Sequence, residues 1–161
     1  MWHDAPTQAI ERTYTRIQRE RFAGTPLQHP GLRVQAVDVQ RWQGHWLGAL
    51  VTPWCLSLLL LPGPGGNWRM PAGNARLALH FPVGAIGFLG NDEAGLGPYL
   101  SAALLPDMRA FAAQHQAVRA ARDALGALWD GAPAAAPQPA TVARATAGAA
   151  APTRRRLLGL R

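Results

Sequence analysis

The sequence predicts an α+β fold in which an antiparallel meander sheet of about five to six strands packs with an N-terminal and a C-terminal helix. The first observation is the hydrophobic pattern of residues 1–130. Apolar residues recur at helical spacing near both ends of this range, and six short apolar segments lie between. The second is composition: the 161 residues are 48% hydrophobic and only 16% charged, and 14 Pro and 17 Gly divide them into short pieces. Long helical bundles and coiled coils do not tolerate so many breaks.

The N-terminal helix is expected from Ala5 to Phe22. Ile10, Tyr14 and Ile17 recur at helical spacing, and charged side chains fill the opposite face. The run Gly24-Thr25-Pro26 should end this helix, because glycine and proline both interrupt helical backbone.

The six apolar segments are expected to be strands. Gln43-Gly44 is the predicted turn between the first two, and a Gly-containing loop over residues 91–95 should join the last two as a hairpin. Leucine favours helices, but Cys55–Leu61 is a short run that follows Pro53 and precedes Pro62, so we predict a buried central strand there. The expected strand ranges are 32–39, 45–51, 55–61, 75–81, 84–89 and 98–105.

The C-terminal helix is expected to begin after Asp107, a favourable N-cap residue, and to end near Trp129, with Gly131 as its stop. Residues 1–130 then form one folded domain. Residues 131–161 form an Ala/Pro-rich linker and a basic tail, which we expect to be disordered because so little of that segment can be buried.

The distribution of charge excludes several functions. All 16 basic residues are arginine, so a Walker A phosphate loop and a Schiff-base lysine are absent. The net charge is +7, but residues 1–130 carry 11 Arg against 9 Asp plus Glu, an excess of only +2. A nucleic-acid-binding function through the Arg-rich tail is the alternative that this charge suggests, although such proteins usually carry basic residues on the folded body.

Metal and cofactor sites are not expected. Cys55 is the only cysteine, so it forms no internal disulfide and no Cys-x-x-Cys knuckle. Five histidines are scattered without metal-ligand spacing, and the two serines lie in no Gly-x-Ser-x-Gly elbow. We therefore predict no catalytic residues, no metal and no cofactor.

Location in the cytoplasm is expected from two further features. The N-terminus lacks a basic segment followed by an apolar one, so no secretory signal is visible. The widest uncharged window, residues 42–68, is interrupted by Pro53 and ends in a Pro/Gly run, whereas a membrane helix needs about 20 continuous apolar residues.

Tryptophan is concentrated in that same uncharged window. Trp42, Trp46, Trp54 and Trp68 lie around Thr52-Pro53 and the Pro/Gly loop. Core packing explains some of them, but large aromatic residues at turns are difficult to bury completely and are enriched at protein interfaces. We therefore expect a flat, uncharged binding face.

The Trp-rich segment resembles the signature of the HybE family of NiFe-hydrogenase assembly chaperones. The resemblance covers about residues 5–130 and the last eight or so. It rests on Trp42–Trp54, Leu58–Pro64, Phe81-Pro82-Val83-Gly84 with Phe88, Pro98-Tyr99-Leu100-Ser101 with Leu104, and Arg154–Gly159.

The resemblance implies a non-catalytic α+β chaperone that acts in the cytoplasm, before twin-arginine export, on a NiFe-hydrogenase large- or small-subunit precursor or on other maturation proteins. Which subunit is bound, and whether the export signal is contacted, stay open. We predict that the partner-binding residues are Trp42, Trp46, Thr52, Pro53, Trp54, Pro62, Gly63, Trp68, Tyr99, Arg154, Arg155 and Arg156.

Deleting residues 132–161 should leave folding almost unchanged. Ordering a chain costs about 1–2 kcal/mol per residue, which an Ala/Pro segment with so little to bury does not offset. We expect equal thermal midpoints for the truncated and full-length chains. A large fall in midpoint would contradict the prediction by indicating that the C-terminus docks on the domain.

Overall fold

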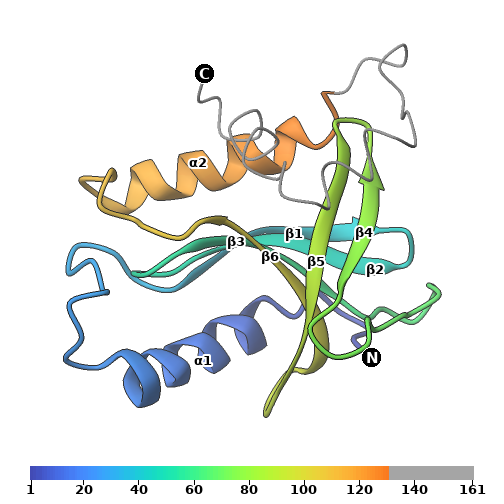
Figure 1. Cartoon of the computed structure of the whole chain (residues 1–161), viewed down its shortest axis with the longest axis horizontal. Coiled ribbons are helices and arrows are strands. Elements are labelled where there is room, and N and C mark those ends of the chain that lie inside the picture. The colour runs from blue at the N-terminus through green and yellow to red at the C-terminus, as the bar shows by residue number, and fades with distance from the viewer. Residues whose placement is uncertain (131–161) are drawn as a thin grey trace.

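The computed structural model describes residues 1–130, in which two helices flank a six-stranded antiparallel sheet (Figure 1). This confirms the predicted α+β class, with one helix before the sheet and one after it. The basic tail, including Arg154, Arg155 and Arg156, and the expected disorder of residues 131–161 lie outside the described residues.

The strands follow the order β1-β2-β3-β6-β5-β4. Their bounds are β1 Gln35–Trp42, β2 His45–Val51, β3 Leu56–Leu61, β4 Arg76–Phe81, β5 Gly84–Glu93 and β6 Gly97–Leu105. The expected single meander is therefore two three-stranded meanders joined by the β3–β6 pair. Residues 62–75 carry the chain from central β3 to the far edge at β4. The hydrophobic pattern predicts which segments are strands but does not specify which strand pairs with which.

Strand β3 is the predicted buried central strand. Every residue from Leu56 to Leu61 is buried. Leu58 and Leu60 belong to the core beneath the C-terminal helix, whereas Leu59 and Leu61 belong to the core beneath the N-terminal helix. Burial on both faces explains why this run is continuously apolar rather than alternating.

The first two strands meet at the predicted Gln43-Gly44 turn. Gln43 and Gly44 have φ values of 49° and 82°, the positive values that a two-residue hairpin turn of type I′ requires. The last two strands run further than expected: β5 continues to Glu93 and β6 begins at Gly97, so the turn occupies residues 94–96.

The N-terminal helix is helical over most of the predicted range but changes type. Helix α1 spans Thr7–Ile17, and a single π-helical turn, η1, continues from Gln18 to Phe22. Ile10 and Ile17 are buried against the sheet, as their spacing predicts. The helix lies on one face of the sheet and contacts β1.

The C-terminal helix begins later than predicted. Helix α2 spans Gln114–Ala127, and its N-cap is Ala113 rather than Asp107. The Asp107 carboxylate instead accepts hydrogen bonds from the Arg109 backbone N–H (2.9 Å) and guanidinium, which closes a local turn. Met108 is buried beside that turn. It therefore belongs to the core, as its apolar character predicts, but it lies before the helix rather than in it.

Helix α2 covers the opposite face of the sheet, above β1, β2 and β3 (Figure 1). Its contact stripe contains Ala117, Ala121 and Ala124, whose small side chains let the helix approach closely. No helix within residues 1–130 is long and apolar enough to cross a membrane.

The loop after β3 packs tightly against the β1–β2 turn. Gly63 is buried, its N–H donates to His45 Nδ1 (3.2 Å), and a Cβ at this position would collide with the Gly44 carbonyl oxygen. The glycine is required there because two backbones meet with no space for a side chain.

Gly63→Ala should therefore lower the free energy of unfolding by about 1–3 kcal/mol, the usual cost of overpacking. Gly126→Ala is the matched control, because Gly126 lies in α2 with open space around it and alanine should add about 0.5–1 kcal/mol there. Denaturant titration of both variants tests the contrast. Equal stability of Gly63→Ala and the parent chain would contradict the close backbone approach.

Candidate functional site

The β2–β3 connection places Trp54 at one end of the sheet. Thr52 is fully buried: its hydroxyl donates to the Cys55 carbonyl oxygen (2.9 Å) and accepts from the Cys55 N–H (3.0 Å). The Thr52 N–H also donates to the Cys55 carbonyl oxygen (3.0 Å), so Pro53 and Trp54 form the tip of a tight turn. Thr52 and Pro53 are buried residues that hold Trp54 in place.

Trp54 stacks on Phe22, the last residue of η1. The ring centroids lie 4.1 Å apart and the planes differ by only 8°. Both residues are half-buried, so the stacked pair keeps an accessible surface. Stacking of this kind adds about 0.5–1.5 kcal/mol beyond area burial and gives the pair a defined orientation.

The stacked pair lines an open groove of about 800 Å³, which we call the Trp54 groove. Apolar side chains predominate in it, and among them Leu27 is 68% exposed. The charged lining residues Asp107 and Arg109 form an ion pair with each other (2.6 Å), so the groove carries no net formal charge. Its principal apolar lining residues are Phe22, Leu27, Pro53, Trp54, Cys55 and Met108.

The other predicted tryptophans do not join this groove. Trp42 stacks on Phe81 (4.6 Å), and Trp68 packs edge-on against His45 (5.2 Å); both lie on the α2 side of the sheet, beside a smaller cavity of about 430 Å³. The Trp68 Nε1–H is buried without a hydrogen-bond partner in the described structure.

Trp46 lies on the opposite side of the sheet, in the core beneath α1. Its Nε1–H donates to the Trp2 carbonyl oxygen (2.9 Å), and the Arg41 guanidinium carbon lies 4.9 Å from its ring. The expectation of one flat Trp-rich face is therefore wrong: successive side chains of a strand point to opposite faces, and Trp54 lies at the far end of β2.

Three further predicted binding residues are buried. Pro62 accepts a hydrogen bond from the Trp2 N–H (2.8 Å), and Gly63 packs against Gly44. Tyr99 is 2% exposed, and its hydroxyl lies 2.7 Å from that of Tyr14 in a hydrogen bond between α1 and β6. These residues support the fold at their positions and offer little surface to a partner.

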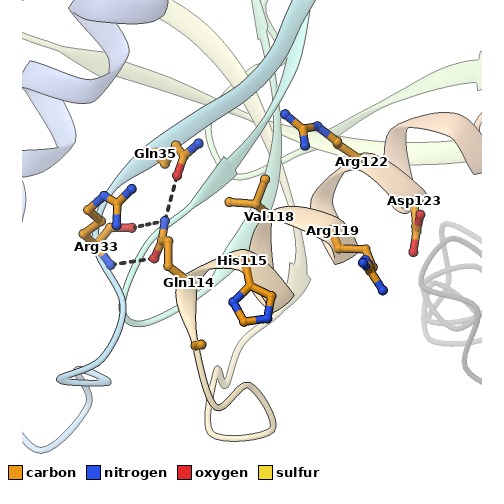
Figure 2. A pocket seen from close by; sticks show the side chains of 9 residues that line it. Arg33, Gln35, Gln114, His115, Val118, Arg119, Arg122 and Asp123 are labelled. Carbon is orange, nitrogen blue, oxygen red and sulfur yellow. Dashed lines mark hydrogen bonds between the residues drawn. The ribbon is translucent and has the colours of Figure 1, made fainter.

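Sequence reasoning missed Phe22, Leu27 and a second, polar pocket. The sequence places Phe22 only at the end of the expected N-terminal helix and assigns no role to Leu27, and no local signal links either residue to Trp54. The second pocket has a volume of about 780 Å³ and lies between the approach to β1 and the first half of α2 (Figure 2). We call it the basic pocket; its charged and polar residues are Arg33, Gln35, Gln114, His115, Arg119, Arg122 and Asp123.

Within residues 1–130, no group of three or more potential metal ligands converges.

Comparison with known proteins identifies the family. A family model described as the NiFe-hydrogenase assembly chaperone HybE matches residues 5–160. The chain belongs to the HybE family. The HoxT hydrogenase expression/formation protein of Azotobacter vinelandii is 32% identical over 133 residues, which cover 82% of this chain and 84% of HoxT.

Two other relatives match this chain over a smaller share of their own length. The probable rubredoxin HupJ of Rhodobacter capsulatus is 33% identical over 119 residues, and HybE of Escherichia coli K12 is 28% identical over 101 residues. The matches cover 74% and 63% of this chain but only 43% of HupJ and 62% of HybE, so this HybE-family chain aligns with about half the length of these relatives.

The fold is also shared. The solution structure of HybE from Escherichia coli superposes with a TM-score of 0.63 and 25% sequence identity, covering 77% of this chain and 76% of that one. The α+β architecture that the resemblance implied is thus found in a solved relative.

The Tyr14–Tyr99 contact predicts a pH dependence of stability. Burial, above all, raises the pKa of both phenols above the usual value of about 10, and the neighbouring Tyr99 adds to the shift of Tyr14. Above about pH 10 the unfolded chain loses these protons while the folded chain keeps them, so the free energy of unfolding should fall as pH rises.

Urea titrations between about pH 8 and about pH 11 should show this fall in the parent chain and a shallower one in Tyr14→Phe/Tyr99→Phe. Phenylalanine keeps the ring packing and removes the titrating hydroxyl. An equally steep fall in the double variant would assign the effect to other groups.

Proposed function

We propose that this chain binds a NiFe-hydrogenase subunit precursor in the cytoplasm, before twin-arginine export, and shields an unassembled apolar segment of it in the Trp54 groove. Membership of the HybE family supports the class of partner. The observation that carries the choice of site is the half-buried Phe22–Trp54 stack beside the exposed Leu27. A rigid aromatic pair in an uncharged groove has the character of an interface hot spot.

The groove suits an apolar polypeptide segment better than a small polar substrate. Its lining offers aromatic, aliphatic and proline surface, and its one ion pair is internally satisfied. A chaperone of this kind needs no catalytic step, because covering apolar surface that is exposed before assembly is itself the function. Both the large- and the small-subunit precursor fit this description.

The remaining predicted residues take different parts in the proposal. Trp42 and Trp68 border the smaller cavity on the α2 side and provide a secondary contact region, whereas Trp46 is held by Trp2 and Arg41 on the other side. Arg154, Arg155 and Arg156 stay a sequence-based proposal for contact with an acidic partner surface. The small charge excess of residues 1–130 does not favour the nucleic-acid alternative.

Trp54→Ala should weaken binding of the precursor by about 30-fold, which corresponds to the roughly 2 kcal/mol typical of a hot spot. Trp54→Phe should retain most of the affinity, because a phenyl ring still stacks on Phe22. Titration calorimetry with the purified large- and small-subunit precursors measures both effects and shows which subunit binds.

Trp46→Ala is the control. Its indole packs beneath α1 and donates to Trp2. Its loss should therefore lower the thermal midpoint and leave the affinity for the precursor nearly unchanged. If folded Trp54→Ala binds both precursors as tightly as the parent chain does, the groove is not the binding site.

A further inference from the structure

The basic pocket lies where the approach to β1 meets α2 (Figure 2). His115, Arg119 and Arg122 recur at helical spacing and project from one face of α2, and Arg33 approaches from the facing segment. Figure 2 shows Arg33 and Arg119 on either side of His115, so their charges border a shared open space.

Hydrogen bonds fix the backbone of this pocket, and none of those formed within residues 1–130 involves the Arg33 side chain. Gln114 Oε1 accepts from the Arg33 N–H (2.9 Å), and Gln114 Nε2 donates to the Arg33 carbonyl oxygen (3.2 Å) and to Gln35 Oε1 (3.0 Å). The two walls are therefore tied together before any ligand arrives, which lowers the ordering cost of binding.

The pocket holds more positive than negative charge. Arg122 has an acidic neighbour, Asp38 (3.4 Å), but neither Arg33 nor Arg119 takes part in any ion pair formed within residues 1–130. The first turn of α2 contains no acidic residue and its N-cap supplies no side-chain hydrogen bond, so the positive end of the helix dipole adds to the field. Asp123 is the only acid among the lining residues.

The basic pocket and the Trp54 groove share one end of the molecule. The segment before β1 lines the groove at Leu27 and His29 and the pocket at Arg33, and the segment before α2 lines the groove at Met108 and the pocket at Ala113. His29 Nε2 lies 2.7 Å from the Phe111 carbonyl oxygen, and this hydrogen bond joins the two segments.

We propose that the basic pocket binds an acidic segment of the same polypeptide whose apolar segment occupies the Trp54 groove. This proposal rests on the proposed function. It specifies in addition that the recognised polypeptide carries an acidic segment next to its apolar one. Carboxylates pair with the planar fork of arginine through two hydrogen bonds, and the chain uses only arginine for its basic side chains. The chain's own tail does not fit, because residues 131–161 contain five Arg and no acid.

An acidic polypeptide fits better than a nucleic acid. Phe, Tyr and Trp are absent from the pocket lining, so bases find no stacking platform of the usual kind. The adjoining groove offers apolar contact of the kind a polypeptide segment uses.

The test uses the full-length chain and two fluorescent peptides of about a dozen residues. Both carry the same apolar stretch of Leu, Phe and Ala; one continues with a run of Glu and the other with a run of Gln. We expect the Glu peptide to bind about 10-fold more tightly at low salt and this preference to decline as salt rises. Arg33→Gln/Arg119→Gln should abolish the preference without changing the affinity for the Gln peptide.

Two comparisons keep the basic pocket and the groove distinguishable. Arg12→Gln/Arg76→Gln removes the same charge from exposed positions outside both sites and should preserve the preference. Trp54→Ala should weaken both peptides by the same factor; an unchanged affinity there overturns the groove but not the pocket. Equal binding of the two peptides by the parent chain, equal losses in the two arginine double variants, or stronger competition by a single-stranded oligonucleotide than by unlabelled Glu peptide would each overturn the pocket proposal.

Discussion

Burial of β3 on both faces is the constraint from which the rest of the structure follows. Its leucines face α1 on one side and α2 on the other, so neither helix is dispensable for covering the sheet. The strand also requires well-formed turns at both ends, because its exits pass through tightly packed backbone at Gly63 and at Thr52.

Those two ends of β3 have different characters. At one end, Gly63 and His45 pack the loop against the β1–β2 turn, and half-buried Trp42 and Trp68 border a small cavity. At the other end, the Thr52 turn presents Trp54 to Phe22, with exposed Leu27 nearby. The second end collects residues from the π-helical turn, the loop before β1, the β2–β3 turn and the segment before α2. Connections of this kind carry binding functions because a rigid sheet positions them.

In the proposed binding mode, an apolar groove next to a basic pocket gives a HybE-family chain both affinity and selectivity for charge. Apolar burial in the Trp54 groove would supply affinity with little discrimination, whereas Arg33 and Arg119 would select for charge and accelerate encounter with an acidic partner. The small charge excess of residues 1–130 matters here, because a strongly basic body would bind any polyanion. The basic pocket, with three Arg and one Asp in its lining, is one local excess of positive charge beside the apolar contact.

The sequence by itself determined the α+β class, the buried central strand, the two terminal helices, the Gln43-Gly44 turn and the family, because each depends on local periodicity, turn chemistry or a distinctive motif. The sequence indicated Trp54 as a binding residue but grouped it with Trp42, Trp46 and Trp68. In the structure Trp46 lies on the opposite face of the sheet from Trp42 and Trp68, and the length of β2 places Trp54 away from all three. Only the tertiary structure decided that β4 pairs at the far edge, that Met108 is buried without a helix, and that Phe22 stacks on Trp54. The Arg33 and Arg119 pocket likewise depends on α2 crossing above β1. These contacts join residues far apart in the chain, and no local pattern encodes which distant partners meet when the two layers pack.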